Sequence, residues 1–401
     1  MNDYLNALQP YPFARLRNLF EGLEPNPTLR PINLGIGEPQ HRAPEHVLKA
    51  LNQHIETISN YPTVLGLPEL RDAISRWART RFHLTTLDPK TQILPVNGTR
   101  EALFSIAQVI CSPTRPSTVF APNPFYQIYE GAALMAGAAL RLLPCEADCN
   151  HQPDYKALSD EDWASCDLLY ICNPGNPAGG LIDRGTLSFL IEKALQHDFV
   201  IVSDECYSEI YPAENTPPAG LLEVCAQIGN EDYHNCLVFH SLSKRSNLPG
   251  MRSGFVAGDA TILSSYLQYR TYHGCTMPIY HQYASIAAWQ DEQHVVTNRS
   301  LYRTKFELVL DSLKDLYDLS YPEGGFYIWL PTPIDDEIFA RQLYQEFSIT
   351  ALPGTYLGRS VDGRNPGKGY LRLALVASVE DCVEAAARIV TLTRQLRAKH
   401  G

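Results

Sequence analysis

Hydrophobic residues between positions 93 and 258 alternate between two patterns. Short, nearly continuous apolar runs are typical of strands buried on both faces of a sheet. The runs lie at 93–96, 118–121, 138–143, 167–172, 199–203, 236–240 and 254–258. Between these runs, stretches such as 187–195 have apolar residues three and four apart, which predicts amphipathic helices. We therefore predict an α/β fold whose large domain has a mostly parallel seven-stranded sheet between layers of helices.

The two ends of the chain have a different character. Residues 1–30 are rich in Pro and Asn, which predicts an extended arm with room for one helical turn. Beyond residue 291 we expect a smaller α+β domain, built from helices at about 300–316 and 379–396 and strands at 321–330, 349–352 and 369–375. The predicted division is an arm and the start of the small domain at 1–45, a large domain at 46–290 and the small domain at 291–401.

Composition narrows the class of protein. The formal net charge of -11 would repel phosphates, which argues against a nucleic-acid or anionic-membrane partner, and no apolar run is long enough to span a membrane. The ten cysteines form no CxxC pair, which favours free thiols in a reducing cytoplasm. Because the twelve histidines lack any ligand spacing such as HExxH, we expect no metal.

Charged side chains at the ends of predicted strands are the chemical signal. Lys244 follows the strand at 236–240 within HSLSKRSNLPGMRSGF, where burying an ammonium group is costly. Ser241, Ser243 and Arg252 nearby could form an anion site beside this amine. Asp204 closes the strand at 199–203, and a buried carboxylate there requires a cation or strong hydrogen bonds.

Other strand ends could accommodate a ligand. Gly98 and Thr99 lead from the strand at 93–96 into a helix, an arrangement that favours phosphate and also fits a plain helix cap. Asn176 lies in NPGNPAGG, where the proline that follows it is rigid, with a cis bond as one option. Gly37 in LGIGEP would let a ligand approach the backbone closely, although a Gly-Pro turn explains it equally well.

The SLSK segment with its following arginine resembles the pyridoxal-phosphate lysine segment of class I and II aminotransferases, and further matching segments occur in the family's order over residues 30–400. The resemblance implies a fold type I aminotransferase. It implies that Lys244 bonds to the cofactor aldehyde and then moves a proton, and that Asp204 keeps the ring nitrogen protonated. Asn176 and Tyr207 would stabilise the phenolate oxygen.

The resemblance also implies the remaining contacts. An aromatic ring would stack on the cofactor, with Tyr126 favoured and Phe125 as the alternative. Gly37, Asn176 and Arg372 would bind substrate, with Arg372 in YLRLA holding the α-carboxylate. Tyr61 would reach the phosphate of a second subunit, which implies a homodimer with shared sites. The phosphate would otherwise be held by Gly98, Thr99, Arg100, Ser241, Ser243 and Arg252.

The segments SLSKRSNLPGMRSGFVAGD, PNPFYQIYEGAALMAGA and ICNPGNPAGG resemble those of proteobacterial succinyldiaminopimelate aminotransferases of lysine biosynthesis. This resemblance implies transfer of an amino group from glutamate to N-succinyl-2-amino-6-oxopimelate, a substrate with several carboxylates. Candidate cations for these are Arg30, Arg245, Arg270 and Lys368, each of which is explained more simply as a solvated surface charge.

Several alternatives stay open. An aspartate or aromatic aminotransferase and a carbon–sulfur lyase would use the same scaffold. A cofactor-binding regulator without turnover is disfavoured, because the chain has no basic helix-turn-helix extension. In a plain structural α/β protein, the placement of Lys244, Asp204 and Arg372 would be coincidental.

Overall fold

The large part of the molecule is built on one eight-stranded sheet. The structure is a computed structural model that describes residues 2–400, so the outermost residues of the predicted arm and small domain, Met1 and Gly401, lie outside the described residues. The strand order is β2-β9-β8-β7-β6-β3-β4-β5. The strands are β2 (Ile93–Val96), β3 (Thr118–Asn123), β4 (Ala139–Glu146), β5 (Gln152–Pro153), β6 (Leu168–Cys172), β7 (Val200–Asp204), β8 (Cys236–Ser241) and β9 (Gly254–Gly258).

The pairing confirms a mostly parallel sheet. From β8 through β7, β6 and β3 to β4 all neighbours run parallel, whereas β9 is antiparallel to both β8 and β2. The seven predicted strands are present. The eighth, β5, pairs with the end of β4 over two residues and is too short to leave a pattern in the sequence.

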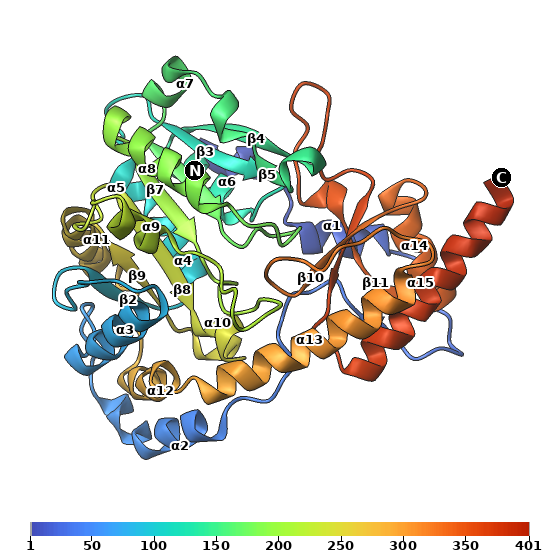
Figure 1. Cartoon of the computed structure of the whole chain (residues 1–401), viewed down its shortest axis with the longest axis horizontal. Helices are drawn as coiled ribbons and strands as arrows, with labels where there is room; N and C mark the ends of the chain where they lie inside the picture. Colours follow the sequence, from blue (N-terminus) through green and yellow to red (C-terminus); the bar gives the residue numbers. More distant parts are fainter. Residues whose placement is uncertain (1, 401) are drawn as a thin grey trace.

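The apolar runs arise because both faces of the sheet are covered. Leu169 and Ile201 belong to one hydrophobic cluster, whereas their neighbours Leu168 and Val202 belong to another on the opposite face. Successive side chains of a strand point to opposite faces, so each strand must be apolar throughout. The helices that cover and flank the sheet surround it in Figure 1.

These helices are α2 (Glu45–Gln53), α3 (Pro68–Arg81), α4 (Thr99–Ser105), α5 (Ala107–Ile110), α6 (Ile128–Met135), α7 (Asp160–Ala164), α8 (Arg184–His197), α9 (Leu221–Gln227), α10 (Leu242–Arg245), α11 (Ala260–His273) and α12 (Ile279–Trp289). Short 3₁₀ helices lie at Asp3–Ala7, Ile55–Ser59, Ala147–Cys149, Tyr155–Ala157, Pro249–Met251 and Gly354–Tyr356.

The C-terminal part has its own hydrophobic core and a three-stranded antiparallel sheet in the order β10-β13-β12. A separate short strand, β1, pairs parallel with β11 and brings Ile32 and Leu34 into this core. The elements are β1 (Ile32–Asn33), α13 (Gln293–Leu313), β10 (Tyr327–Pro331), α14 (Asp336–Phe347), β11 (Ile349–Thr350), β12 (Leu352–Pro353), β13 (Tyr370–Ala374) and α15 (Val379–His400). Figure 1 shows α13 running from the large sheet to lie beside α15.

Several element boundaries differ from expectation. The strand expected at 349–352 is two short strands, β11 and β12, which belong to different sheets. Helix α13 begins at Gln293 and not near 300, because Val295 is buried and continues its apolar side. Strand β10 begins at Tyr327 and not at 321, because the backbone bends at residues 323–326, which include Gly324 and Gly325. The predicted boundaries at 45 and 290 stay a prediction.

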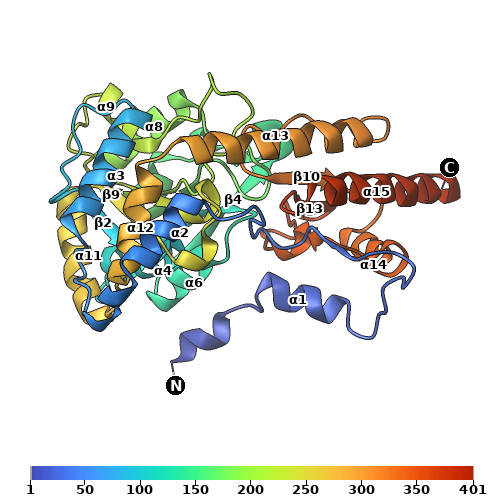
Figure 2. The ribbon, with the colours of Figure 1, turned by 90° about the horizontal axis from the view of Figure 1, so that it is seen from below.

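The N-terminal arm is more helical than predicted. Helix α1 (Pro12–Leu19) follows the 3₁₀ helix at Asp3–Ala7. Pro12 occupies the first turn, where proline starts a helix and does not break one. Leu16 of α1 is buried with Trp329 and Leu352 of the C-terminal part. Figure 2 shows this arm along one side of the molecule.

No helix within residues 2–400 is both long and apolar enough to cross a bilayer.

Candidate active site

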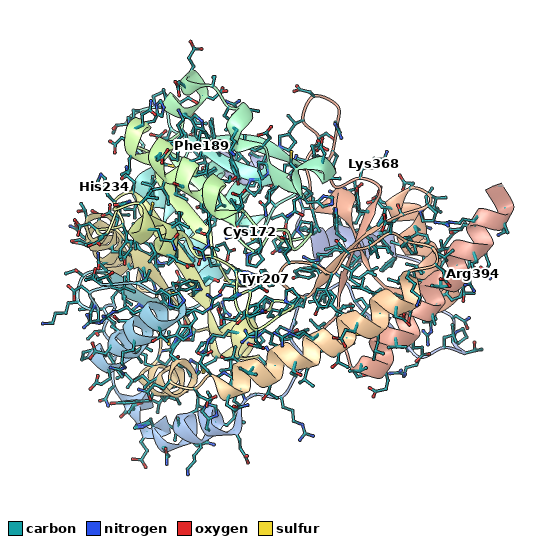
Figure 3. All side chains as sticks on the ribbon, in the orientation of Figure 1. Cys172, Phe189, Tyr207, His234, Lys368 and Arg394 are labelled. Atoms are coloured by element: carbon teal, nitrogen blue, oxygen red, sulfur yellow. The ribbon has the colours of Figure 1, made fainter. Side chains whose placement is uncertain are left out.

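A cavity of about 470 Å³ lies where β7 and β8 end, between the large sheet and the C-terminal part. Its lining comes from segments far apart in the sequence. The predicted residues that line it are Gly37, Thr99, Arg100, Tyr126, Asn176, Asp204, Tyr207, Ser241, Ser243, Lys244, Arg252 and Arg372. Figure 3 shows Tyr207 at this central position, whereas Lys368 lies on the C-terminal part away from it.

The amine of Lys244 projects into the cavity from α10, the short helix that follows β8 directly. Its Nζ donates to the carbonyl oxygen of Gly37 at 2.5 Å and lies 5.3 Å from the centre of the Phe326 ring. Burial, assisted by the positive charges of Arg372 and Arg100, lowers the pKa of Lys244 to about 8. About a tenth of this amine is therefore an uncharged nucleophile near pH 7, far more than for an ordinary lysine.

Asp204, the last residue of β7, is a buried carboxylate in the same cavity. Its Oδ2 accepts a hydrogen bond from the Tyr129 hydroxyl at 2.9 Å, and its Oδ1 accepts one from the Cys206 N–H at 3.3 Å. Burial raises the pKa of Asp204 above its usual value, against these hydrogen bonds. A ligand cation placed against it would favour the ionised form.

One end of the cavity is suited to an anion. Arg252 provides a guanidinium group whose Nη1 donates to the Pro249 carbonyl at 2.8 Å. Ser241 donates from its Oγ to the Oγ of Ser243 at 2.9 Å, and both hydroxyls reach the cavity. Gly98 has a φ of +87°, and a Cβ added to it would lie 2.0 Å from Nη2 of Arg252. The positive φ disfavours any other residue at Gly98, and a side chain there would displace the guanidinium group of Arg252 from its present position.

Arg100 occupies a different position from Arg252. Its Nε donates to the Tyr126 hydroxyl at 2.7 Å, its guanidinium carbon is 5.9 Å from the centre of the Tyr11 ring, and the side chain is exposed. Its predicted contact with phosphate stays a prediction. Of the two aromatic candidates for stacking on the cofactor, Tyr126 lines the cavity, whereas Phe125 is buried outside its lining.

The opposite side of the cavity is built around Arg372 of β13. Its Nη2 donates to the Gly35 carbonyl at 3.0 Å, its Nη1 donates to the Asn176 side-chain oxygen at 3.2 Å, and its guanidinium carbon lies 4.4 Å from the centre of the Tyr327 ring. The buried Nε has no hydrogen-bond partner, and no carboxylate of the described residues pairs with Arg372. A buried guanidinium group without an anion is costly, so this one is suited to a ligand carboxylate.

Some lining residues were missed by sequence reasoning. The Tyr327 hydroxyl lies 2.9 Å from the Tyr207 hydroxyl. A Cβ on Gly37 would lie 2.0 Å from the Tyr327 hydroxyl oxygen. Tyr11 and Phe13 reach the cavity from the N-terminal arm, which carried no signal beyond its Pro and Asn content. Tyr61 is fully exposed and does not line the cavity.

The cis proline bonds also differ from expectation. They are Asn123–Pro124 and Asn173–Pro174, not the bond after Asn176.

The four candidate cations for distal carboxylates lie outside the cavity lining. Arg245 and Arg270 are not surface charges, because they are buried in ion pairs with Glu292 and Glu101. Arg30 forms exposed ion pairs with Asp381 and Glu384, and Lys368 is exposed near Asp335.

Comparison with known proteins gives the same family throughout. Residues 30–389 match the family model described as Aminotransferase class I and II. The chain is 30% identical over 393 residues to the LL-diaminopimelate aminotransferase of Desulforudis audaxviator, which covers 96% of each chain.

Solved structures agree. An aminotransferase from Neisseria meningitidis matches with a TM-score of 0.94 and 46% identity over 98% of this chain and 100% of that chain. Aminotransferase AspB from Helicobacter pylori matches with a TM-score of 0.89 and 39% identity over 96% of this chain and 99% of that chain.

A family match over nearly the whole chain thus accompanies a cavity that holds an amine, a buried carboxylate and an anion site. The chain belongs to the class I and II aminotransferases of fold type I, enzymes that depend on pyridoxal phosphate.

Proposed function

We propose that this aminotransferase transfers an amino group between glutamate and N-succinyl-2-amino-6-oxopimelate, in the diaminopimelate route to lysine. The observation that carries the reaction type is that Lys244, Asp204 and Arg372, from α10, β7 and β13, face one cavity. A cytoplasmic location belongs to the same proposal, because all ten cysteines are unpaired.

The side chains that line the cavity fit pyridoxal phosphate. When bound, the cofactor supplies an aldehyde for an amine and a protonated ring that accepts an electron pair. Lys244 is the amine, and the buried carboxylate of Asp204 suits the ring nitrogen. Arg252, Ser241 and Ser243, with the N–H groups at Gly98 and Thr99, would hold the phosphate.

The protein's own groups then have separate tasks. The guanidinium group of Arg372, which lines the cavity and has no carboxylate partner, would fix the α-carboxylate of the amino acid. Lys244 Nζ, whose pKa of about 8 lies far below that of an ordinary lysine, would take the proton from the substrate Cα and return it on the other side of the transferred nitrogen. Tyr207 and the amide of Asn176 would act as hydrogen-bond donors to the cofactor oxygen.

The position of Arg100 favours a substrate that has a second carboxylate. Four cationic side chains line the cavity, namely Lys244, Arg252, Arg372 and Arg100. With the first three assigned to the amine, the phosphate and the α-carboxylate, Arg100 at the exposed mouth is left for a distal carboxylate. The relative named LL-diaminopimelate aminotransferase supports a diaminopimelate-type substrate, and the sequence segments quoted above support its succinyl form.

Aspartate is the second candidate substrate, because Arg372 and Arg100 would bind its two carboxylates equally well. A panel of amino donors with 2-oxoglutarate separates the alternatives: N-succinyl-diaminopimelate, LL-diaminopimelate, aspartate, an aromatic amino acid and cystathionine as a lyase substrate. We expect the largest kcat/KM for N-succinyl-diaminopimelate. A larger value for any other donor would replace the proposed substrate and leave the reaction type intact.

The reaction type is tested with Lys244→Ala and a control substitution at an exposed lysine, Lys49→Ala. We expect the control to keep both the visible absorbance of lysine-bound cofactor and turnover. Lys244→Ala should lose this absorbance and at least ~10⁴-fold of kcat, because nucleophile and proton carrier are removed together. Transamination by Lys244→Ala at the parent rate would refute the assignment.

A further inference from the structure

A buried lysine outside the cavity has an unusual environment. Lys305 of α13 is 2% exposed, and its Nζ lies 2.7 Å from Nε2 of His41 and 3.3 Å from the carbonyl oxygen of Val376. Its Nζ also lies 5.1 Å from the centre of the Tyr302 ring. No carboxylate among the described residues forms an ion pair with it. A buried ammonium group without a counter-ion is costly, so its other contacts must be well defined.

The contact with Lys305 determines which nitrogen of His41 carries the proton. Burial lowers the pKa of Lys305 to about 8, so the group is still mostly an ammonium at neutral pH. An ammonium has donors and no acceptor, so Nε2 of His41 accepts. In a neutral imidazole the proton is then on Nδ1, which lies 2.7 Å from the side-chain oxygen of Asn298. Burial and the positive charge of Lys305 lower the pKa of His41, while the bond to Asn298 acts in the opposite direction. His41 is therefore neutral at physiological pH.

His41 in turn orients the Asn298 amide. Because the Asn298 oxygen accepts from Nδ1 of His41, its NH₂ group points the other way. That group donates to the carbonyl oxygens of Lys244 at 3.2 Å and Arg245 at 3.3 Å. A continuous chain of hydrogen bonds thus runs from Lys305 through His41 and Asn298 to the backbone of the lysine that lines the cavity.

The same peptide segment contacts Lys244 a second time. Residues 37–41 include Gly37, whose carbonyl oxygen accepts from the Lys244 amine, and His41, which holds the Lys244 backbone through Asn298. The amine and the backbone of Lys244 are therefore both held by residues 37–41, the amine directly and the backbone through Asn298. A shift of His41 would change the path of this segment and the position of the amine together.

We propose that Lys305 and His41 are positioning residues for Lys244: the Lys305 ammonium selects the Nδ1–H form of His41, which aligns the Asn298 amide that holds the Lys244 backbone. This inference rests on the proposed role of Lys244 and adds residues that touch neither cofactor nor substrate.

The tautomer is measured first, without cofactor. In protein labelled with ¹⁵N-histidine and stripped of pyridoxal phosphate, we expect the His41 signal of a neutral ring protonated at Nδ1. Lys305→Met, which keeps an unbranched side chain as far as Cε and removes the donor, should move the signal toward the Nε2-protonated form. A His41 ring protonated at Nε2 in the wild-type protein would overturn the proposal. This measurement is independent of whether the enzyme uses the proposed substrate.

Two substitutions of His41, by Asn and by Gln, test the two hydrogen bonds of its ring separately. In His41→Asn the side-chain nitrogen falls near Nδ1 and keeps the bond to Asn298, whereas in His41→Gln the side-chain oxygen falls near Nε2 and keeps only the bond to Lys305. We expect kcat to fall about tenfold in His41→Gln and no more than about threefold in His41→Asn, with KM within about twofold in both. Even these losses are small beside the ~100-fold that a 1 Å misplacement costs.

A readout without substrate separates positioning from loss of fold. We expect the pH midpoint of the visible absorbance of the resting enzyme to move by at least about 0.5 in His41→Gln and by less in His41→Asn, because this midpoint reports the surroundings of the Lys244 nitrogen. The same substitutions at the exposed His83 are the control and should leave kcat and midpoint unchanged. Equal effects of Asn and Gln at position 41, or no shift in either, would overturn the proposal. Absence of any lysine-bound cofactor in the wild-type protein would instead refute the proposed function.

Discussion

At the scale of single residues, burial in the cavity shifts the pKa values of an acid and a base in opposite directions. Burial lowers the pKa of Lys244 to about 8 and raises that of Asp204. In both cases removal from water disfavours the charged form. The hydrogen bonds of Asp204 and Lys244 offset part of the cost of burying them, and a bound cofactor with a ring nitrogen and an aldehyde would offer each group a further partner.

The first prediction concerns the pH dependence of Lys244 in protein stripped of cofactor. Only the uncharged amine attacks an aldehyde, so the rate of reaction with pyridoxal phosphate should rise with pH and level off above about 8. A lysine with an ordinary pKa would give a rate that still rises at pH 10. Stopped-flow absorbance across this range measures it, and a rate still climbing at pH 10 would contradict the lowered pKa.

The second prediction concerns Asp204→Asn. Because the folded-state pKa of Asp204 is raised, the folded protein binds its proton more tightly than the unfolded chain does. This group therefore favours the folded state at low pH, and its contribution is lost as pH rises through the folded-state pKa. At neutral pH the cofactor-free Asn variant should melt at a higher temperature than the wild type, while kcat of the loaded enzyme falls at least ~100-fold.

Calorimetry and single-turnover kinetics measure the two effects of Asp204→Asn. A lower melting temperature of the cofactor-free variant would contradict the raised pKa, and an unchanged single-turnover rate would contradict the role of the carboxylate.

Sequence reasoning identified the charged residues of the site and missed several neutral ones. Lys244, Asp204 and Arg372 stood out because a charge within an apolar strand pattern is costly. Tyr129 and Tyr327 did not, because a tyrosine in an apolar segment is usually core, and its hydroxyl partner is set by tertiary packing.

At the scale of elements, the turn before α4 and the loop before β9 depend on each other. Gly98 lies at a φ that disfavours side chains, directly against the guanidinium group of Arg252. Arg252 itself has a φ of 51°. Packing of these two backbone segments thus shapes the end of the cavity that carries Arg252, where we propose that the phosphate binds.

The third prediction tests this packing. Gly98→Ala should weaken pyridoxal phosphate binding about tenfold or more, because an overpacked site costs about 1–3 kcal/mol. Gly229→Ala is a matched control, since Gly229 has a φ of +88° and nothing within 4 Å of an added Cβ. The control should lose about 1 kcal/mol of stability and no cofactor affinity. Equal losses of affinity in both variants, measured by fluorescence titration, would contradict the account.

Strands were easier to predict than the boundaries of helices. The central strands are apolar on both faces, and this pattern needs no knowledge of the partner strand. Helix α1 was missed because prolines near positions 10 and 12 read as breakers, although one of them starts the helix. The first residues of α13 were missed because polar residues precede Val295.

At the scale of the whole molecule, the site is assembled from both parts and the arm. The sheet provides Asp204 and the segment of Lys244, the C-terminal part provides Arg372 and Tyr327, and the arm provides Tyr11. The sequence can indicate a candidate segment by its own pattern. It cannot show that these segments meet in one cavity, because their contacts depend on long-range packing. Tyr61 is fully exposed and does not line the cavity. Its contact with the cofactor phosphate of a second subunit stays a prediction.

The fourth prediction tests a shared site in a homodimer. Tyr61→Ala and Lys244→Ala homodimers should each be weakly active or inactive. Mixed dimers should contain one site with both Lys244 and Tyr61 intact, and should therefore recover about half of the wild-type activity. Sedimentation measures the dimer, and co-expression with two affinity tags isolates the mixed form. A mixed dimer no more active than its parents would contradict the shared site.

The most direct measurement of the central claim is a map of where the cofactor is attached. Borohydride reduction of the pyridoxal-phosphate-loaded enzyme, followed by proteolysis and mass spectrometry, fixes the cofactor to the nitrogen that held it. We predict one modified peptide, which contains SLSKR with the added mass on Lys244. Attachment at any other lysine, with Lys244 unmodified in active enzyme, would contradict the account.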